Sequence, residues 1–256
     1  MRIGVGIPVY NGETYLTQAV ESVLNQTRLP DKIIIYDDGS TDKTMAIATE
    51  LGKKYEEKIR KLSGFRFMQG GMNKGIGYGR YFLAEQLRQD CDYLAFISAD
   101  DVWESQFLEI MENIAKEHPG EIIFCATNLI NQDGDSILQG KARNFENYGD
   151  FVKDCWDAAR KYKMFVNFTG ILIPTSVFEK INFDSQEKIG EDLRFLLESI
   201  SFHKIRYHYV DIPLIQYRCH NQMTTVIKVK EIGKNDEKIM ADIKKKILEK
   251  KEKIMV

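Results

Sequence analysis

Two pairs of adjacent aspartates follow short apolar runs in the first half of the chain. Asp37 and Asp38 come after the run KIIIY, and Asp100 and Asp101 come after YLAFI and two small residues. If both runs are parallel strands of one sheet, all four carboxylates lie on the same edge, where they repel one another. A hard divalent cation such as Mg²⁺ or Mn²⁺, shared with a diphosphate, would relieve that repulsion. The alternative is that either pair only caps a helix or forms a turn.

Apolar runs alternate with amphipathic segments of helical period around these aspartates. Strands are expected at residues 3–9, 32–36, 65–68 and 93–97, and helices at 15–24, 41–57, 77–88 and 107–115. Runs that are apolar throughout favour a mainly parallel sheet with helices on both faces, because each strand is then buried on both sides. Ligands of such open sheets bind at the carboxyl ends of the strands, which is where the aspartates fall.

The second half of the chain has a less regular pattern. Helices are expected at residues 151–162 and 193–200, and strands at 170–174, 205–210 and 214–217. No internal repeat and no linker of disordered composition divides the chain, so residues 1–225 are expected to form one domain. Residues 226–256 differ in composition, with ten lysines against six acidic residues.

The composition is that of an ordinary globular protein. Of 256 residues, 43% are hydrophobic and 5 are proline, which excludes a disordered or collagen-like chain. The 36 basic and 38 acidic residues give a net charge of -2, so no overall basic field attracts nucleic acid. The apolar runs are far shorter than the ~20 residues of a membrane span, and the first residues lack a signal-peptide layout. Four widely spaced cysteines predict reduced thiols in a cytoplasmic protein.

Four segments, in this order, resemble the family 2 glycosyltransferases of the GT-A fold: IPVYNGETYLTQAVESVLNQT, IIIYDDGSTDKT, NKGIGYGR and ISADDVW. The likeness continues through FTGILIPTSVFEKINF, GEDLRFLLE and QYRCHNQMTT, so it covers about residues 2–225. It implies a nucleotide-binding half at 1–101 and an acceptor half at 102–225. It also implies transfer of a sugar, with inversion, from a nucleotide-diphospho-sugar to an acceptor hydroxyl in the synthesis of a cell-surface glycan or polysaccharide. A UDP-sugar is the expected donor.

The resemblance implies how the donor is bound. Tyr10 matches the position whose ring packs on the donor uracil, and Asp38 matches the carboxylate that hydrogen-bonds the base or the ribose. Arg80 matches a basic position near the nucleotide, where a guanidinium can pair with phosphate; a solvated helix cation is the alternative. The donor site expected on this basis comprises Pro8, Tyr10, Glu13, Asp38, Arg80, Ser98 and Asp100.

The segment ISADD stands where the family carries an Asp-x-Asp signature. Ser98 replaces the first acid, whereas Asp100 is retained and is implied to be the direct ligand of Mn²⁺ or Mg²⁺. His220 is expected as a further contact to the metal or the diphosphate, with a packed histidine as the alternative. Asp101 is expected either to orient the acceptor or to cap the next helix, and the cap is favoured.

The acceptor side is implied by two further segments. Asp192 matches the general base that takes the proton from the acceptor hydroxyl. Glu191 precedes it at the start of a helix, where the helix dipole alone also favours acids. Gly170 matches a small residue beneath the acceptor sugar. The acceptor set is therefore Gly170, Glu191 and Asp101, and the implied acceptor is a glycan or a lipid-linked molecule.

Two other functions remain open at this stage. The loss of an acid at Ser98 suggests a degenerate member that binds nucleotide-sugar or glycan without turnover. A sugar nucleotidyltransferase, whose sheet is related, usually has a first loop rich in glycine and basic residues, and the loop VYNGET does not match that pattern. We therefore favour the glycosyltransferase.

The basic tail has two interpretations. Ile239, Ile243, Ile247 and Ile254 fall on one helical stripe flanked by lysines. An amphipathic helix of this kind is expected to pack on the domain or to pair with a second copy of the chain. The alternative is a peripheral contact with the inner face of an anionic membrane, which would bring the site to a lipid-linked acceptor.

Overall fold

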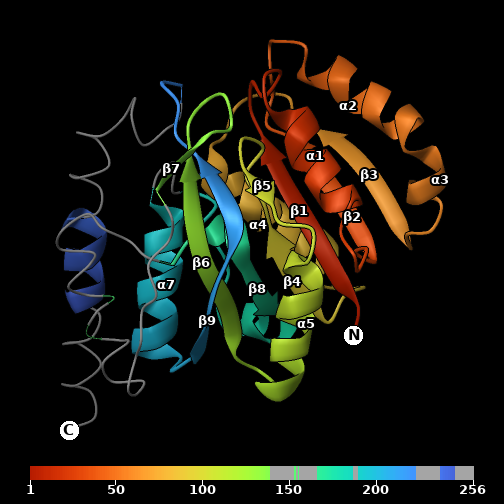
Figure 1. Ribbon diagram of the computed structural model, residues 1–256. Coiled ribbons are helices and arrows are strands. Elements are labelled where there is room, and N and C mark those ends of the chain that lie inside the picture. The colour runs from red at the N-terminus through yellow and green to blue at the C-terminus, as the bar shows by residue number, and fades with distance from the viewer. Residues whose placement is uncertain (139–152, 154, 156–165, 187–189, 223–236, 246–256) are drawn as a thin grey trace, which may run out of the picture.

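The computed structural model describes residues 1–138, 153, 155, 166–186, 190–222 and 237–245. Their strands form one nine-stranded sheet in the order β3-β2-β1-β4-β8-β6-β9-β5, with β7 paired to β6 (Figure 1). The strands are β1 (Ile3–Val9), β2 (Lys32–Asp37), β3 (Gly64–Gln69), β4 (Tyr93–Phe96), β5 (Val102–Trp103), β6 (Ile122–Ile130), β7 (Ser136–Leu138), β8 (Ile171–Pro174) and β9 (Tyr207–Arg218). The helices are α1 (Leu16–Leu24), α2 (Thr44–Lys54), α3 (Glu56–Ile59), α4 (Ile76–Leu87), α5 (Phe107–Glu117), η1 (Phe168–Gly170), η2 (Thr175–Glu179) and α7 (Glu191–Phe202).

The sheet is more mixed than the sequence predicted. β1 pairs in parallel with β2 and β4, β2 with β3, and β6 with β9, whereas β5, β7 and β8 run antiparallel to their neighbours. Because β8 is antiparallel to both β4 and β6, those two strands point the same way. β1, β2, β3, β4, β6 and β9 therefore all end at one edge of the sheet, which we call the carboxyl edge.

Helices cover both faces of the sheet, as predicted. Consecutive residues of a strand point to opposite faces, so Ile33 and Ile35 pack with α1, α2 and α5, while Ile34 packs with α4 and α7. Every residue of β1 and β2 is buried, which explains why these strands are apolar almost without interruption. The sheet is thus packed between two hydrophobic cores, one on each face, which fix the strands that end at the carboxyl edge.

Several elements differ from the sequence-based expectation. The helix expected at 41–57 breaks at Tyr55 into α2 and α3. The two strands expected at 205–210 and 214–217 are one strand, β9, whose pairing with β6 shifts register around Ala126. Pro213 lies at that shift, because proline cannot donate to the ladder and is confined to bulges and edges. β6 was not predicted, and the helix expected at 151–162 lies almost wholly outside the described residues.

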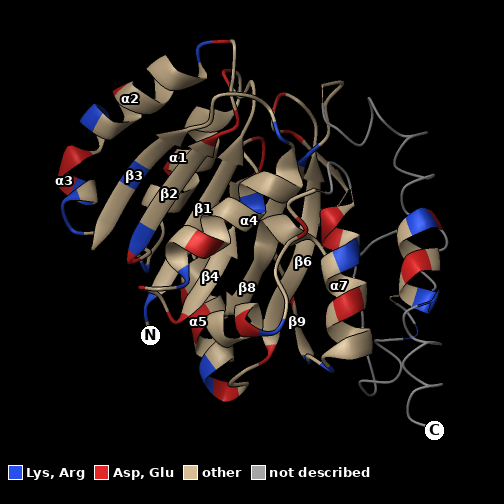
Figure 2. Cartoon of the chain, turned by 180° about the vertical axis from the view of Figure 1, so that it is seen from behind, with Lys and Arg blue, Asp and Glu red and all other residues tan. Residues whose placement is uncertain are grey.

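The described part of the tail packs on the domain. Residues 237–245 are helical and lie beside α7 in both Figure 1 and Figure 2. Ile239 and Ile243 are buried in the same core as α7, and Asp242 forms an ion pair of 2.9 Å with Arg194 of that helix. This part of the isoleucine stripe therefore stabilises the domain, and its lysines face outward. The remainder of the stripe lies outside the described residues.

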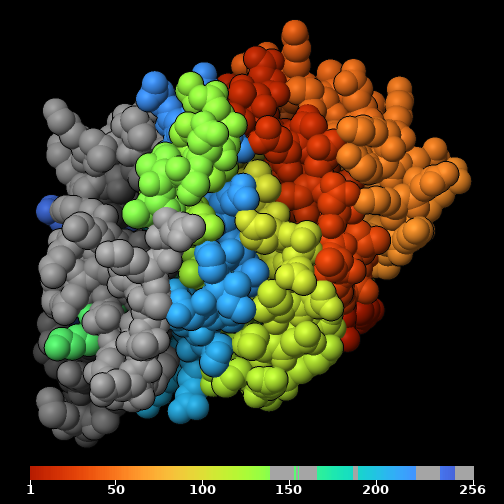
Figure 3. Space-filling model, viewed as in Figure 1, coloured from red at the N-terminus to blue at the C-terminus, as the bar shows by residue number. Residues whose placement is uncertain are grey.

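β9 is open to solvent along its middle. Figure 3 shows its residues at the surface beside α5, and Asp211, Ile212 and Pro213 are exposed. Across the described chain, no helix combines the length and apolar character that crossing a membrane requires.

Candidate active site

The carboxylate of Asp38 is held at the carboxyl edge by the loop that precedes α4. Its Oδ2 atom accepts hydrogen bonds from the backbone N–H of Lys74 at 2.9 Å and of Gly75 at 2.7 Å. The side chain is buried, and no hydrogen bond of normal geometry reaches its Oδ1 atom. The Tyr36 hydroxyl is close by, and burial together with the Asp38 charge raises the pKa of Tyr36 to about 12. Burial raises the pKa of Asp38, although the two N–H donors oppose that shift. Asp38 therefore retains unsatisfied acceptor capacity that an N–H or hydroxyl of a ligand can fill.

The Asp37 side chain stabilises the turn that follows β2. Its Oδ1 atom accepts from the backbone N–H of Ser40 at 2.9 Å and from the hydroxyl of Ser40 at 2.5 Å. Gly39, inside this turn, has a φ of +81°, which side chains rarely adopt, and a Cβ there would lie 2.9 Å from the backbone of Met72. The turn is thus fixed in shape, and Asp37 has a structural role.

Asp100 and His220 meet at the carboxyl edge, from the loops after β4 and β9. Nε2 of His220 lies 3.1 Å from Oδ2 of Asp100, and Nδ1 of His220 accepts from the N–H of Gln222 at 3.3 Å. In the neutral ring the proton therefore sits on Nε2 and is donated to Asp100. The ring of Tyr15 packs against His220 with centroids 4.9 Å apart. The Asp100 side chain is 33% exposed and that of His220 is 8% exposed, so solvent reaches the pair from the Asp100 side.

Arg218, which the sequence analysis did not single out, organises this corner. Its backbone N–H donates to Oδ1 of Asp101, and its Nε donates to the backbone oxygen of Asp100, both at 2.9 Å. The guanidinium also donates to Gln18 and lies 4.7 Å from the ring centroid of Tyr15. Arg218 is 2% exposed, and its buried side chain links the loop after β4 to the end of β9. Its place two residues before His220 was the available signal.

The prediction that Asp101 caps the next helix is wrong. That helix, α5, begins at Phe107, and strand β5 lies between the two. β5 pairs with β9, which brings the N–H of Arg218 to the Asp101 carboxylate. Asp101 is 1% exposed, and burial, with the nearby charge of Asp100, raises its pKa well above the ordinary value. This burial leaves no exposed carboxylate there to orient an acceptor.

Ser98 and Gly170 are positioned by the packing of β8 beside β4. The backbone N–H of Ser98 donates to the hydroxyl of Thr169 at 2.9 Å. A Cβ on Gly170 would lie 1.6 Å from Cδ1 of Ile215, which is buried in β9. The small size of Gly170 is therefore explained by the packing of Ile215, whereas the sequence analysis assigned it to an acceptor sugar.

Arg80 and Glu191 are joined in a buried ion pair between α4 and α7. The Nη1 atom of Arg80 bonds Oε1 of Glu191, and its guanidinium lies 5.7 Å from the ring centroid of Phe168. The structure thus gives Arg80 a carboxylate partner where the sequence predicted phosphate, and it gives Glu191 a cation where an acceptor was predicted. Because Arg80 lies in the second turn of α4, this pair holds the first turn of α7 near the carboxyl edge.

Asp192 follows Glu191 in that first turn. Its side chain is half-buried, and its Oδ1 atom accepts from the N–H of Leu193 at 2.7 Å. The left-handed Gly190, with φ of +80°, starts the helix. Asp192 is therefore held in a fixed position with part of its carboxylate accessible.

The loop after β1 contains the other predicted donor contacts. Tyr10 is 48% exposed and presents its ring to solvent. Pro8 is buried in β1, where a Cβ on Gly79 of α4 would lie 3.2 Å from it. Glu13 accepts from the N–H of Lys43 at 3.1 Å and so fixes the loop before α2. Of these three, Tyr10 is the one placed to stack on a base, while Pro8 and Glu13 shape the edge.

The fold is shared with a protein of known structure. S. aureus TarS, residues 1–349 in complex with UDP, superposes with a TM-score of 0.62 at 19% identity, covering 95% of this chain and 70% of that one. The same protein in complex with UDP-GlcNAc gives a TM-score of 0.64 at 17% identity, covering 95% and 71%. At these identities the likeness establishes the GT-A fold alone.

Sequence comparison establishes the family. Residues 4–181 match the family described as Glycosyl transferase family 2. This match spans well over half of the chain, so the protein belongs to glycosyltransferase family 2 and is a glycosyltransferase enzyme.

Two curated relatives cover most of this chain. An uncharacterized glycosyltransferase of Rickettsia typhi is 28% identical over 257 residues, which is 99% of this chain and 74% of that protein. The minor teichoic acid biosynthesis protein GgaB of Bacillus subtilis is 26% identical over 231 residues, which is 90% of this chain and 24% of GgaB. The chain thus spans about three quarters of the first relative and about a quarter of the second.

Proposed function

We propose that this protein is an inverting glycosyltransferase that transfers a sugar from a UDP-sugar to an acceptor hydroxyl. The observation that carries the proposal is the unsatisfied Oδ1 atom of buried Asp38, at the same edge as the accessible pair Asp100 and His220. Family membership supports the reaction class, and the UDP and UDP-GlcNAc complexes of TarS support the donor.

The donor base is proposed to lie over the ends of β1 and β2. Tyr10 would stack its exposed ring on the uracil, and Asp38 would accept an N–H of the base or a ribose hydroxyl at Oδ1. Each interaction uses a group that the protein itself leaves available. Pro8 and Glu13 act by fixing the backbone around these two residues.

The residues at the end of β4 fit a divalent cation. Asp100 and His220 offer a carboxylate oxygen and an imidazole nitrogen 3.1 Å apart, on an accessible part of the edge. Coordination through Nε2 would place the ring proton on Nδ1, so the hydrogen bond that Nδ1 accepts from Gln222 would have to be replaced by one that Nδ1 donates. A mixed oxygen and nitrogen set suits Mn²⁺ better than Mg²⁺, which prefers oxygen ligands throughout. When bound, such a cation neutralises charge on the diphosphate of the leaving nucleotide.

Asp192 is proposed as the general base. Its position in the first turn of α7, held by the Arg80–Glu191 ion pair, keeps the carboxylate near the carboxyl edge. There it would take the proton of the acceptor hydroxyl as that oxygen attacks the anomeric carbon from the side opposite the nucleotide. Direct displacement inverts the anomeric centre, and no covalent sugar–enzyme intermediate forms.

The acceptor is proposed to be a cell-surface glycan or a related lipid-linked polymer. The name of the relative GgaB, a teichoic acid biosynthesis protein, supports this class. The membrane contact proposed for the tail would concern the lysine-bearing outer side of the helix, since Ile239 and Ile243 are buried.

The test is the substitution Asp192→Asn, which keeps the side-chain volume and removes the proton acceptor. Turnover of UDP-sugar should fall by about 10²–10⁴-fold, while UDP binding measured by calorimetry stays unchanged. Asp211→Asn, in the exposed middle of β9, is the matched control and should retain activity. Near-normal turnover by Asp192→Asn would exclude Asp192 as the base. Absence of any turnover by the wild-type protein with a panel of UDP-sugars, despite UDP binding, would favour the degenerate member.

A further inference from the structure

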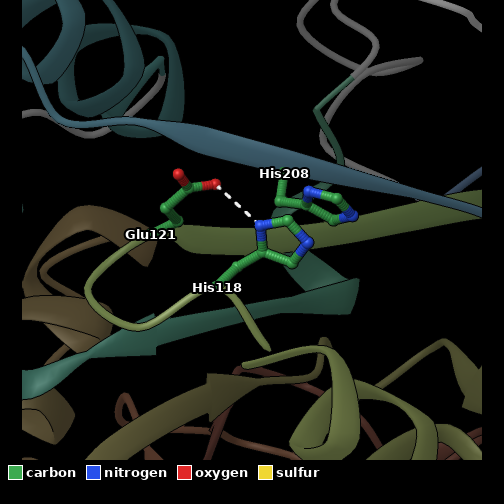
Figure 4. A group of neighbouring side chains, drawn as sticks. All are labelled: His118, Glu121 and His208. Atoms are coloured by element: carbon green, nitrogen blue, oxygen red, sulfur yellow. Dashed lines mark ion pairs between the residues drawn. The ribbon is translucent and has the colours of Figure 1, made fainter. Parts of the chain in front are cut away.

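A second cluster of metal-ligating side chains lies at the opposite edge of the sheet. His118 directly follows α5, Glu121 comes three residues later, and His208 is the second residue of β9 (Figure 4). One potential ligand atom from each lies within 4.8 Å of the others, and no second group of three such side chains is found in the described part of the chain. β9 runs ten residues from His208 to Arg218, about 30 Å in an extended strand. The cluster is therefore separate from Asp100 and His220.

A tight turn brings two of these side chains together. The N–H of Glu121 donates to the backbone oxygen of His118 at 3.2 Å, closing a four-residue turn. Pro119 and Gly120 occupy its centre, and Gly120 has a φ of +82°, the combination that a type II turn requires. The parallel pairing of β6 with β9 then places His208 beside this turn. The three side chains are thus held by rigid backbone rather than by a long loop.

The ligand atoms of this cluster are close enough to share an ion. Nδ1 of His118 lies 3.7 Å from Oε2 of Glu121, which is too long for a hydrogen bond and forms an ion pair when the ring is protonated (Figure 4). Two ligands of one tetrahedral Zn²⁺ are about 3.4 Å apart, because each bond is about 2.1 Å long. The rings of His118 and His208 stack with centroids 3.7 Å apart and planes 28° apart. Because an imidazole binds an ion in the plane of its ring, at least one of the two stacked rings would have to turn before all three ligands meet at one ion.

Each histidine can offer a ring nitrogen lone pair to an ion when its ring is neutral. Glu121, only partly exposed, supplies the negative charge.

We propose that His118, Glu121 and His208 bind one Zn²⁺ ion, which ties the turn between α5 and β6 to the start of β9. Two imidazole nitrogens and one carboxylate are ligands that zinc accepts, whereas Mg²⁺ and Ca²⁺ prefer oxygen ligands throughout. Three protein ligands leave a fourth position for water. The ion stabilises the fold and takes no part in sugar transfer.

The experiment is a Zn²⁺ titration of the full chain after treatment with EDTA. Calorimetry of His220→Ala, which lacks the imidazole of the cation site proposed at the carboxyl edge, should give one site, and saturating Zn²⁺ should raise the thermal midpoint by about 5 °C. Co²⁺ in place of Zn²⁺ should give the visible absorption of a four-coordinate ion. His118→Ala and His208→Ala should each weaken binding by more than about 100-fold, since loss of even a supporting residue costs 10–100-fold.

Two matched histidine variants separate this site from the rest of the chain. His203→Ala changes an exposed histidine at the end of α7, and His220→Ala removes the imidazole at the carboxyl edge. Both should retain the Zn²⁺ site. Circular dichroism checks that each variant is folded, and if a histidine variant unfolds, Glu121→Gln should weaken binding by at least about 10-fold. The proposal is overturned if the wild type binds no Zn²⁺, if His118→Ala and His208→Ala bind it as tightly, or if His220→Ala abolishes binding.

Discussion

The two aspartate pairs at the carboxyl edge look alike in sequence but divide their roles in opposite order. After β2, the first acid, Asp37, is satisfied by Ser40 within its own turn, while the second, Asp38, retains an unsatisfied oxygen. After β4, the first acid, Asp100, is accessible, while the second, Asp101, is buried on the N–H of Arg218. In each pair one carboxylate fixes the edge, and the other is offered to a ligand.

This difference shows that hydrogen bonds from nearby backbone N–H groups decide which acid of each pair is structural. Asp37 faces a turn whose own N–H groups need an acceptor, and Asp101 faces the end of a strand with an N–H to satisfy. The remaining acid of each pair is offered to a ligand, since Asp38 keeps Oδ1 without a partner and Asp100 is accessible from solvent. Asp101 also keeps an oxygen without a partner, Oδ2, but its side chain is 1% exposed. Substitutions within each pair should therefore separate function from stability.

The largest effect is expected at Asp100. Asp100→Ala removes the carboxylate proposed as a metal ligand, so transfer should fall by at least about 100-fold in kcat/KM, and the Mn²⁺ concentration needed for half-maximal rate should rise. Excess chelator should likewise abolish transfer by the wild-type protein. The check is steady-state kinetics across a Mn²⁺ titration. Transfer that persists unchanged in chelator would remove the metal from the mechanism.

The next effect is expected at Asp38. In Asp38→Asn the amide oxygen must stay on the N–H groups of Lys74 and Gly75, so the NH₂ group occupies the Oδ1 position. A donor then faces the donor of the nucleotide, and UDP should bind at least about 10-fold more weakly. UDP calorimetry measures this loss.

Asp37→Asn is the matched variant of that experiment. It places an NH₂ group against the amide of Gln69 and should lower the free energy of unfolding by about 1 kcal/mol, with UDP affinity unchanged. Urea unfolding gives the stability. If the two variants lose UDP affinity equally, the division of roles after β2 is wrong.

The sequence predicted the first half of the fold well because its strands are buried on both faces. β1 and β2 are almost uninterrupted apolar runs that end at turn-forming residues, so their positions were readable. β6 was missed because Thr127 and Asn128, which are polar and only partly buried, interrupt its apolar run. β9 was read as two strands because DIP, which is a bulge in the structure, resembles a turn in sequence.

Positions at the carboxyl edge could be predicted from local pattern, whereas contacts with distant parts of the chain could not. Asp38 and Asp100 were placed at that edge because they directly follow strands, and their roles in binding stay predictions. Arg218 was missed, and Asp101 misassigned, because each finds its partner 117 positions away along the chain. Gly170 was assigned to an acceptor contact, but a side chain there would collide with Ile215. Ile215 lies in β9, which the sequence analysis divided into two strands. Such long-range packing leaves no local pattern in a single sequence.

The smallest effect on sugar transfer is expected at Asp101, where the change appears in the pH dependence of stability. Because burial raises the pKa of Asp101 well above that of the unfolded chain, the folded protein keeps a proton that the unfolded chain loses above about pH 4. This group therefore makes stability fall as pH rises through the interval between the two pKa values, by at most about 1.4 kcal/mol per pH unit. Asp101→Asn keeps an oxygen for the N–H of Arg218 but cannot ionise, so its stability should fall less steeply over that interval. Urea unfolding of both proteins from pH 4 to pH 8 measures the two slopes. The prediction is wrong if Asp101→Asn is unfolded at every pH, or if its stability changes with pH as steeply as that of the wild type. Either result would show that the Asp101 carboxyl is ionised in the folded protein rather than buried and protonated.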